Sequence, residues 1–162
     1  MFSLTGHINF NGNGLEKRLS NLYPYEFEIG GIMVKSMEGF LQSLKTSDIY
    51  HKQKLWNLSG GLAWKYGQQF NWKEKQSLNW QKKEINRHSE EYKKLIEYSY
   101  DCLFKNEQFV LNLKESIGYD LNHTIGNNNP YKTVLTKYEF LHNLNRLRDK
   151  LKPPRFYNLF DI

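Results

Sequence analysis

The sequence predicts a single α+β domain that is mostly helical and has a small β-sheet. Three observations lead to this prediction. The chain has 162 residues, which is the usual size of one compact domain. Apolar residues recur at helical spacing in several segments, and one alternating segment contains a Gly-Gly turn. Since no repeat or Pro-rich linker interrupts the sequence, we expect residues 1–162 to form one domain.

The predicted β-hairpin covers residues 25–34. Residues 25–29 alternate between apolar and polar side chains, and Ile32-Met33-Val34 continues in an extended pattern. Gly30-Gly31 supplies the positive backbone angles that a tight turn needs. Residues 7–10 are a candidate for another short strand. The region of Trp80 either adds a strand or forms an irregular loop.

Helices are expected over most of the remaining chain. Apolar residues at helical spacing predict a helix from Ser36, its N-cap, to about Lys45. The same period runs for about four turns in residues 89–104. Thr136 and Glu139 form a capping box before a helix that should end near Leu151, ahead of two prolines. The last ten residues are expected to pack back onto the body.

Composition favours an anionic partner. The chain has 23 Lys and Arg against 17 Asp and Glu, a net charge of +6, and a positive net charge attracts anions. The basic residues are spread along the chain and interleaved with acids, so no basic tract points to nucleic acid. Four Trp and 11 Tyr supply rings for the core and for stacking on a base or sugar.

Several classes of protein are excluded. No apolar run approaches the roughly 18 to 20 residues of a spanning helix, and no secretory or transit signal is visible, so a cytoplasmic location is expected. Cys102 is the only cysteine, which rules out an internal disulfide and a Cys-rich zinc site, and its surroundings indicate a buried structural residue. The glycine pairs lack the P-loop and Rossmann fingerprints.

One polar stripe on the helix predicted after the hairpin is a candidate site. Glu38, Gln42 and Lys45 stand at i, i+4 and i+7, within a stripe of about 60° at the edge of the apolar face. Such a stripe can line a cleft, although an ordinary solvated face has the same spacing. A carboxylate and an amine together can cleave a bond at a sugar anomeric carbon, provided that burial lowers the pKa of Lys45 enough to make it nucleophilic.

Two other clusters carry weaker signals. Trp80 and Gln81, with Glu84, Arg87 and His88, suit a phosphate or a base, but a capped helix start with solvated charges would look the same. His123 has no companion residues at metal-ligand spacing. We therefore expect no zinc site.

These motifs together resemble a known family. The segment Leu19-Ser20-Asn21-Leu22-Tyr23-Pro24, a hairpin, and then Ser36-x-Glu38-x-x-x-Gln42-x-x-Lys45 are similar to the opening of the NADAR superfamily of YbiA-like proteins. Later blocks look like a branch common in phages and bacteria; they are Trp80-Gln81, residues 87–92, 121–126 and 133–136, Glu139-Phe140 and Leu147-Arg148. Together the blocks span nearly the whole chain.

The resemblance implies an N-glycosidase that hydrolyses the bond between a base or amine and a ribose. Substrates in the family include ADP-ribosylated guanine in nucleotides or nucleic acid, and phosphorylated ribosylamines of the riboflavin pathway. The resemblance implies that some members work through a lysine Schiff base, and neither a metal nor a cofactor is expected. The alternative is a binding module that recognises ADP-ribose or nucleic acid without turnover. It would keep the ring and the arginines without needing a lysine of lowered pKa.

Site residues follow from the matched positions. Glu38 and Lys45 correspond to the family's catalytic carboxylate and lysine. Trp80 is expected to stack on a ring, and Arg87 and Arg148 to neutralise phosphate. The other predicted substrate-binding residues are Ser20, Asn21, Tyr23, Gln42, His123 and Gly126.

The sequence departs from the family pattern at two places. The family's usual histidine after the glutamate is Gly39, and residues 125–130 replace its D-x-x-W-G block. These departures leave the substrate open.

Overall fold

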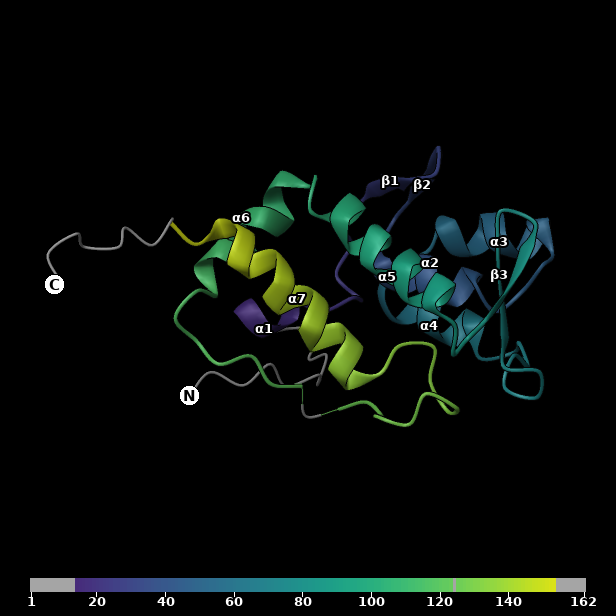
Figure 1. Ribbon diagram of the computed structural model, residues 1–162. Helices are drawn as coiled ribbons and strands as arrows, with labels where there is room; N and C mark the ends of the chain where they lie inside the picture. The colour runs from purple at the N-terminus through teal and green to yellow at the C-terminus, as the bar shows by residue number, and fades with distance from the viewer. Residues whose placement is uncertain (1–13, 124, 154–162) are drawn as a thin grey trace, which may run out of the picture.

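The computed structural model describes residues 14–123 and 125–153. In this part of the chain seven helices and two small antiparallel sheets form the α+β architecture that the sequence predicts (Figure 1). In chain order the elements are α1 (Leu15–Arg18), β1 (Phe27–Ile29), β2 (Ile32–Val34), α2 (Met37–Ser43), α3 (Ile49–Trp56), α4 (Gly60–Gly67), β3 (Ser77–Trp80), β4 (Lys83–Asn86), α5 (Glu90–Leu103), α6 (Glu107–Glu115) and α7 (Lys137–Leu151).

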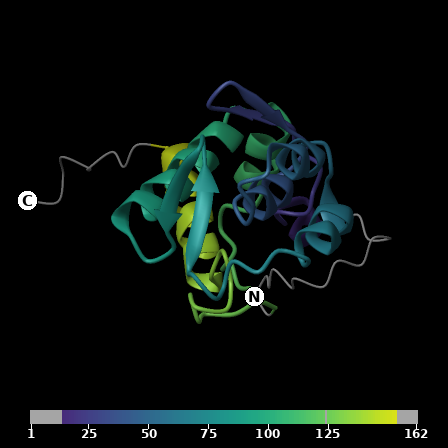
Figure 2. The ribbon, with the colours of Figure 1, turned by 90° about the vertical axis from the view of Figure 1, so that its right-hand side faces the viewer.

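Both sheets are two-stranded hairpins. In the predicted one, β1 pairs with β2, and the turn places Gly30 at φ 56° and Gly31 at φ 79°, a region that glycine enters without steric cost. Trp80 is the last residue of strand β3, which pairs with β4. Gln81 and Lys82 form the turn between the two strands and also have positive φ. In Figure 2 the β1–β2 hairpin lies near the blue helices α2, α3 and α4, and β4 packs against α5.

Helix α2 begins as the sequence predicts. The Ser36 hydroxyl accepts a hydrogen bond from the Gly39 N–H at 3.0 Å, which satisfies one of the unpaired donors of the first turn. Regular helix ends at Ser43, yet the Lys45 N–H still donates to the Gln42 carbonyl at 3.1 Å. Lys45 therefore remains in the last turn, on the stripe predicted for it.

Helix α2 is wedged against α3 and α4. A side chain at Gly39 would place its Cβ 2.6 Å from the Leu55 carbonyl oxygen and 2.7 Å from that of Leu58. This position thus faces the end of α3 rather than open space, and a side chain larger than hydrogen has no room here. The Trp56 indole adds a hydrogen bond to the Ser43 hydroxyl at 3.0 Å.

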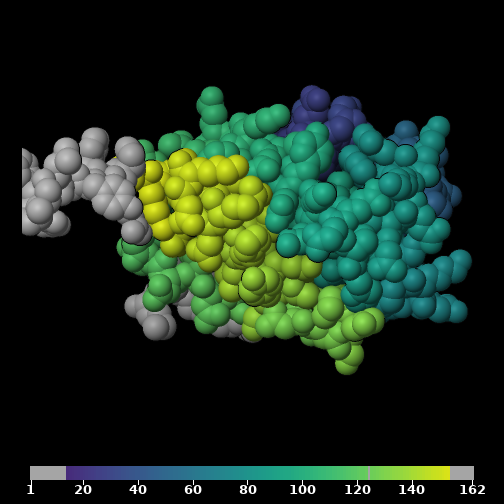
Figure 3. Space-filling model, viewed as in Figure 1, coloured from purple at the N-terminus to yellow at the C-terminus, as the bar shows by residue number. Residues whose placement is uncertain are grey.

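Helices α5 and α7 form the other half of the core. Ser89 caps α5 by accepting from the Tyr92 N–H at 3.1 Å, and the predicted capping box of Thr136 and Glu139 starts α7. The two helices pack against each other, with Arg146 bonded to Asp101 at 2.8 Å. On the face shown in Figure 3, the yellow surface of α7 adjoins the teal surface of the segment that contains α5.

One further sequence prediction can be placed, and two others fall outside the described residues. Cys102 is buried and unpaired, as expected of a structural cysteine. The candidate strand at residues 7–10 and the packing expected for Phe156 to Phe160 lie outside the described residues. Within residues 14–123 and 125–153, none of the helices is both long and apolar enough to cross a bilayer.

Candidate functional site

A cavity of about 730 Å³ lies between the two halves of the core. Its walls come from α2, α4, the loop that precedes β1, and the segment that leads into α7. Seven of the predicted site residues line it: Ser20, Asn21, Glu38, Gln42, Lys45, His123 and Gly126. The cavity has the size and largely apolar lining of a small-molecule site. We call it the first pocket.

The loop that carries Ser20 and Asn21 is tied to the start of α2. The Glu38 N–H donates to the Asn21 carbonyl at 2.9 Å. The Tyr100 hydroxyl, buried in the core, donates to the Asn21 side-chain oxygen at 2.8 Å, and Ser20 Oγ accepts from the Leu22 N–H at 3.2 Å. These bonds hold the loop beside the carboxylate of Glu38.

Glu38 and Gln42 are joined by a short hydrogen bond. Gln42 Nε2 donates to Glu38 Oε1 at 2.6 Å, one helical turn away. The Gln42 side chain is buried, and a Cβ at Gly67 of α4 would fall 1.9 Å from its Oε1. Only a glycine lets α4 approach so closely, and this contact fixes the amide that orients the Glu38 carboxylate.

The pocket alters the proton affinity of both catalytic candidates. Burial lowers the pKa of Lys45 to about 8, with a further lowering by the nearby Lys73 cation, while Glu38 opposes the shift. Burial also raises the pKa of Glu38, against the hydrogen bond from Gln42 and the charge of Lys45. Desolvation disfavours the charged form of each group. An amine whose pKa is about 8 and a carboxyl whose pKa is raised by burial are suited to nucleophilic and acid-base roles.

The remaining charges on the pocket wall are all positive. Glu38 is the only carboxylate among the described lining residues, whereas four lysines besides Lys45 line the same cavity: Lys65, Lys73, Lys132 and Lys137. They come from α4, two loops and the first turn of α7. This wall suits a ligand with more than one negative charge.

Sequence reasoning did not find these lysines, nor Trp64. The lysines are separated by up to 72 positions along the chain, from Lys65 to Lys137, and no basic run reveals them. Trp64 of α4 lines the pocket with its side chain 53% exposed, which is the position expected of a stacking ring. The signal that could have found it is the helical spacing of Gly61, Trp64, Lys65 and Gln68 on one face of α4.

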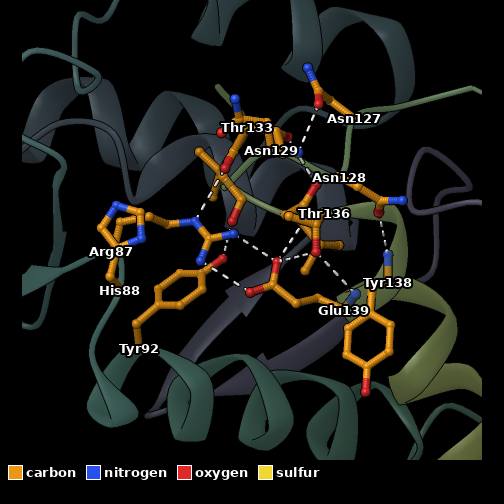
Figure 4. Close-up of polar contacts among 12 residues, drawn as sticks. Arg87, His88, Tyr92, Asn127, Asn128, Asn129, Thr133, Thr136, Tyr138 and Glu139 are labelled. Carbon is orange, nitrogen blue, oxygen red and sulfur yellow. Dashed lines mark hydrogen bonds and ion pairs between the residues drawn. The ribbon is translucent and has the colours of Figure 1, made fainter. Parts of the chain in front are cut away.

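Two predicted site residues, Trp80 and Arg87, serve the core instead. Trp80 is 8% exposed, does not line the pocket, and packs edge-on against Phe40 at 5.3 Å. The prediction that it stacks on substrate is wrong, because the ring is buried in the core and does not reach the first pocket. Arg87 is 2% exposed and donates to both oxygens of Glu139 at 3.0 and 2.7 Å, and to the Thr133 carbonyl at 3.1 Å (Figure 4).

The Arg87 network has a structural role next to the site. Glu139 also accepts from the Thr136 backbone and hydroxyl at 2.7 and 2.8 Å. The ion pair therefore fixes residues 133–136, which form one wall of the first pocket. The Arg87 guanidinium is buried and bonded to Glu139 and Thr133, so its predicted phosphate contact is corrected to support of this wall.

Arg148 and Tyr23 also lie outside the first pocket. Arg148 is buried and donates to the carbonyls of Ser116 and Tyr119 at 3.1 and 2.8 Å, so it closes the end of α6 instead of contacting phosphate. Tyr23 packs against Tyr25 with ring centroids 4.6 Å apart and lines a neighbouring cavity.

His123 and Gly126 stand on the wall opposite α2. The His123 ring lies 4.8 Å from that of Phe140. Gly126 has φ 105°, and a Cβ there would come within 3.0 Å of the Lys137 side chain. Within the described ranges no three His, Cys, Asp or Glu side chains gather as metal ligands do.

Comparisons with known proteins agree with this architecture. Residues 15–149 match the family described as Bacteriophage protein GP30.3. The chain is 32% identical over 136 residues to a 17.1 kDa protein of the Gp30-rIII intergenic region of enterobacteria phage T4, covering 82% of this chain and 90% of that protein. The NMR structure of YbiA from E. coli superposes with a TM-score of 0.57 at 12% identity, covering 92% of this chain and 84% of YbiA.

Proposed function

The chain belongs to the bacteriophage protein GP30.3 family, which is related to NADAR proteins, and it has the fold of YbiA; from this premise we propose that it is an N-glycosidase. Its substrate is ADP-ribosylated guanine in a nucleotide or nucleic acid, or a related ribose-phosphate N-glycoside. The observation that supports this best is the arrangement of Glu38, Gln42 and Lys45 in one pocket, with the pKa of Lys45 lowered to about 8.

The lysine wall supports an anionic substrate. Lys65, Lys73 and Lys132 lie on the same cavity as the catalytic pair, and a diphosphate is the ligand whose charge they complement. These lysines take the role that the sequence suggested for the two arginines. Trp64 stands at this wall with an exposed ring that can stack on adenine.

In the proposed reaction, neutral Lys45 attacks the anomeric carbon of the ribose. A C–N bond forms to Nζ and the bond to the base nitrogen breaks, with the base taking its electron pair and a proton from the Glu38 carboxyl. The Glu38 carboxylate then accepts the proton that the new amine loses. The nitrogen lone pair next forms a C=N bond as the bond from C1′ to the ring oxygen breaks, and that oxygen takes the electron pair and the proton from Glu38, which leaves an open-chain protonated imine. Water adds to the imine, which releases the ribose aldehyde and restores the neutral lysine.

Incubation with ADP-ribosylated guanosine, ADP-ribosylated DNA and a phosphorylated ribosylamine tests the proposal. Release of the base or amine, followed by chromatography, identifies the substrate. Borohydride during turnover should trap an adduct that mass spectrometry locates on Lys45. Binding of all three compounds without any release would instead identify a module that recognises ADP-ribose without turnover.

Two variants separate the roles of the catalytic pair. Lys45→Arg keeps the charge but cannot supply a neutral amine, so hydrolysis should fall by about a thousandfold while ADP-ribose affinity changes little. If Glu38 activates water directly, Glu38→Gln abolishes turnover, Lys45→Arg retains much of it, and no adduct forms. Full activity of both variants would refute the assignment of the site.

A further inference from the structure

A second cavity of about 730 Å³ adjoins the first pocket. The two cavities share four lining residues, Ser20, Leu22, Gly61 and Lys65. These residues belong to the loop before β1 and to α4, the same two elements that place Asn21 and Trp64 in the first pocket. A ligand that extends across these shared residues would contact both cavities at once. We call the cavity lined by Tyr23, Pro24 and Leu62 the second pocket.

The lining of the second pocket suits a planar ring that carries a negative charge. Tyr23, Pro24 and Leu62 give it an apolar surface, and Leu62 is 67% exposed. The Tyr23 ring packs against Tyr25 at a centroid distance of 4.6 Å. This contact restricts the Tyr23 side chain, so a base that stacks on the ring costs little further conformational entropy. Lys17 and Lys65 lie on the same cavity, and none of its described lining residues is acidic. A neutral lipid would use the apolar surface alone, whereas a nucleotide uses both features.

We propose that the second pocket binds the nucleotide that carries the leaving purine, with the purine stacked on Tyr23 and its phosphate near Lys65. This inference rests on the proposed function, because it divides that substrate between two cavities. The ADP-ribosyl group lies in the first pocket, among the lysines and beside Glu38 and Lys45. The scissile bond then lies beside Glu38 and Lys45 in the first pocket, and the leaving nucleotide extends past the shared residues Ser20 and Gly61 into the second pocket.

Two fragments of the substrate test the division without any turnover. ADP-ribose represents the part in the first pocket, and guanosine 5′-monophosphate represents the leaving part. In calorimetric titrations, protein saturated with ADP-ribose should bind guanosine 5′-monophosphate with a dissociation constant within about threefold of that for the free protein. Competition between the two fragments, or no binding of guanosine 5′-monophosphate, would overturn the proposal.

Variants of Tyr23 locate the second fragment. Tyr23→Leu should weaken the binding of guanosine 5′-monophosphate by at least about fivefold, the lower end of what one stacked base contributes. The affinity for ADP-ribose should not change. Tyr23→Phe keeps the ring and should bind both fragments as the wild type does. Tyr138→Leu removes a tyrosine that is 72% exposed on α7 and away from both cavities, and should change neither affinity.

The outcomes also separate this inference from the proposed function. Independent binding of the two fragments with no hydrolysis of the joined substrate would leave the second pocket intact and refute the glycosidase. Hydrolysis with mutually exclusive fragments would support the glycosidase and refute the second pocket. An equal loss of affinity for both fragments in Tyr23→Leu would mean that the substitution disturbs the whole loop. This result would overturn the assignment of Tyr23 as the ring on which the purine stacks.

Discussion

The titration of Lys45 is the most direct physical test of the site. Its pKa is lowered from 10.5 to about 8. At pH 7 about one molecule in ten then carries a neutral amine, against about one in three thousand for an ordinary lysine, a difference of about 300-fold. The neutral fraction of Lys45 rises with pH, reaches one half near pH 8 and dominates at higher pH. This enrichment would be the main contribution of the pocket to a nucleophilic amine.

Two substitutions should move this titration in opposite directions. Glu38 favours the charged form of Lys45, so Glu38→Gln should lower the pKa of Lys45 further. Lys73 disfavours that form, so Lys73→Met should raise it. Glutamine and methionine are similar in length to the residues that they replace, which keeps the pocket filled. The opposite signs distinguish a local electrostatic effect from a general loosening of the fold.

The assay needs no substrate. The protein is treated briefly with an amine-acylating reagent between pH 6 and 11, and peptide mass spectrometry follows acylation at Lys45. The midpoint should lie near pH 8 in the wild type, lower in Glu38→Gln and higher in Lys73→Met. A wild-type midpoint above pH 10, or shifts of the same sign in the two variants, would refute the electrostatic reasoning.

Three further predictions concern packing and charge. Gly39→Ala should lower the free energy of unfolding by about 2 kcal/mol in urea titrations. The added Cβ would meet two backbone carbonyls at 2.6 and 2.7 Å, and this overpacking exceeds the gain in helix propensity. An unchanged free energy of unfolding would contradict the close approach of these carbonyls to residue 39. Arg87→Lys loses the bidentate contact with Glu139 and should also lower the free energy of unfolding by about 2 kcal/mol, with the affinity for ADP-ribose nearly unchanged. A large loss of ADP-ribose affinity at unchanged stability would instead show that Arg87 contacts the ligand. Binding of duplex DNA, followed by fluorescence anisotropy, should weaken steeply with salt, with a log-log slope of about −0.9 per phosphate contact, and a flat response would count against nucleic acid as the substrate.

Local patterns were sufficient to identify the main elements. Ser36 and the Thr136–Glu139 capping box mark helix starts through bonds that span three residues, and the Gly30-Gly31 turn depends on backbone angles that glycine permits. Such signals lie within a few residues of one another, so the sequence displays them directly. The stripe of Glu38 and Lys45 is of the same kind, since one helical turn repeats every 3.6 residues.

What surrounds those side chains was decided by tertiary structure alone. The sequence placed Trp80 and Arg87 in the site because an aromatic ring and a guanidinium are typical ligand contacts, yet packing against Phe40 and pairing with Glu139 occupy both side chains. The burial that lowers the pKa of Lys45 likewise depends on distant segments closing over it. Burial and pairing are properties of contacts between segments far apart in the chain, which no local spacing encodes. The sequence therefore determined the β1–β2 hairpin, helices α2, α5 and α7 and the stripe of Glu38 and Lys45, whereas the lysine wall and the two adjoining pockets exist only once the chain has folded.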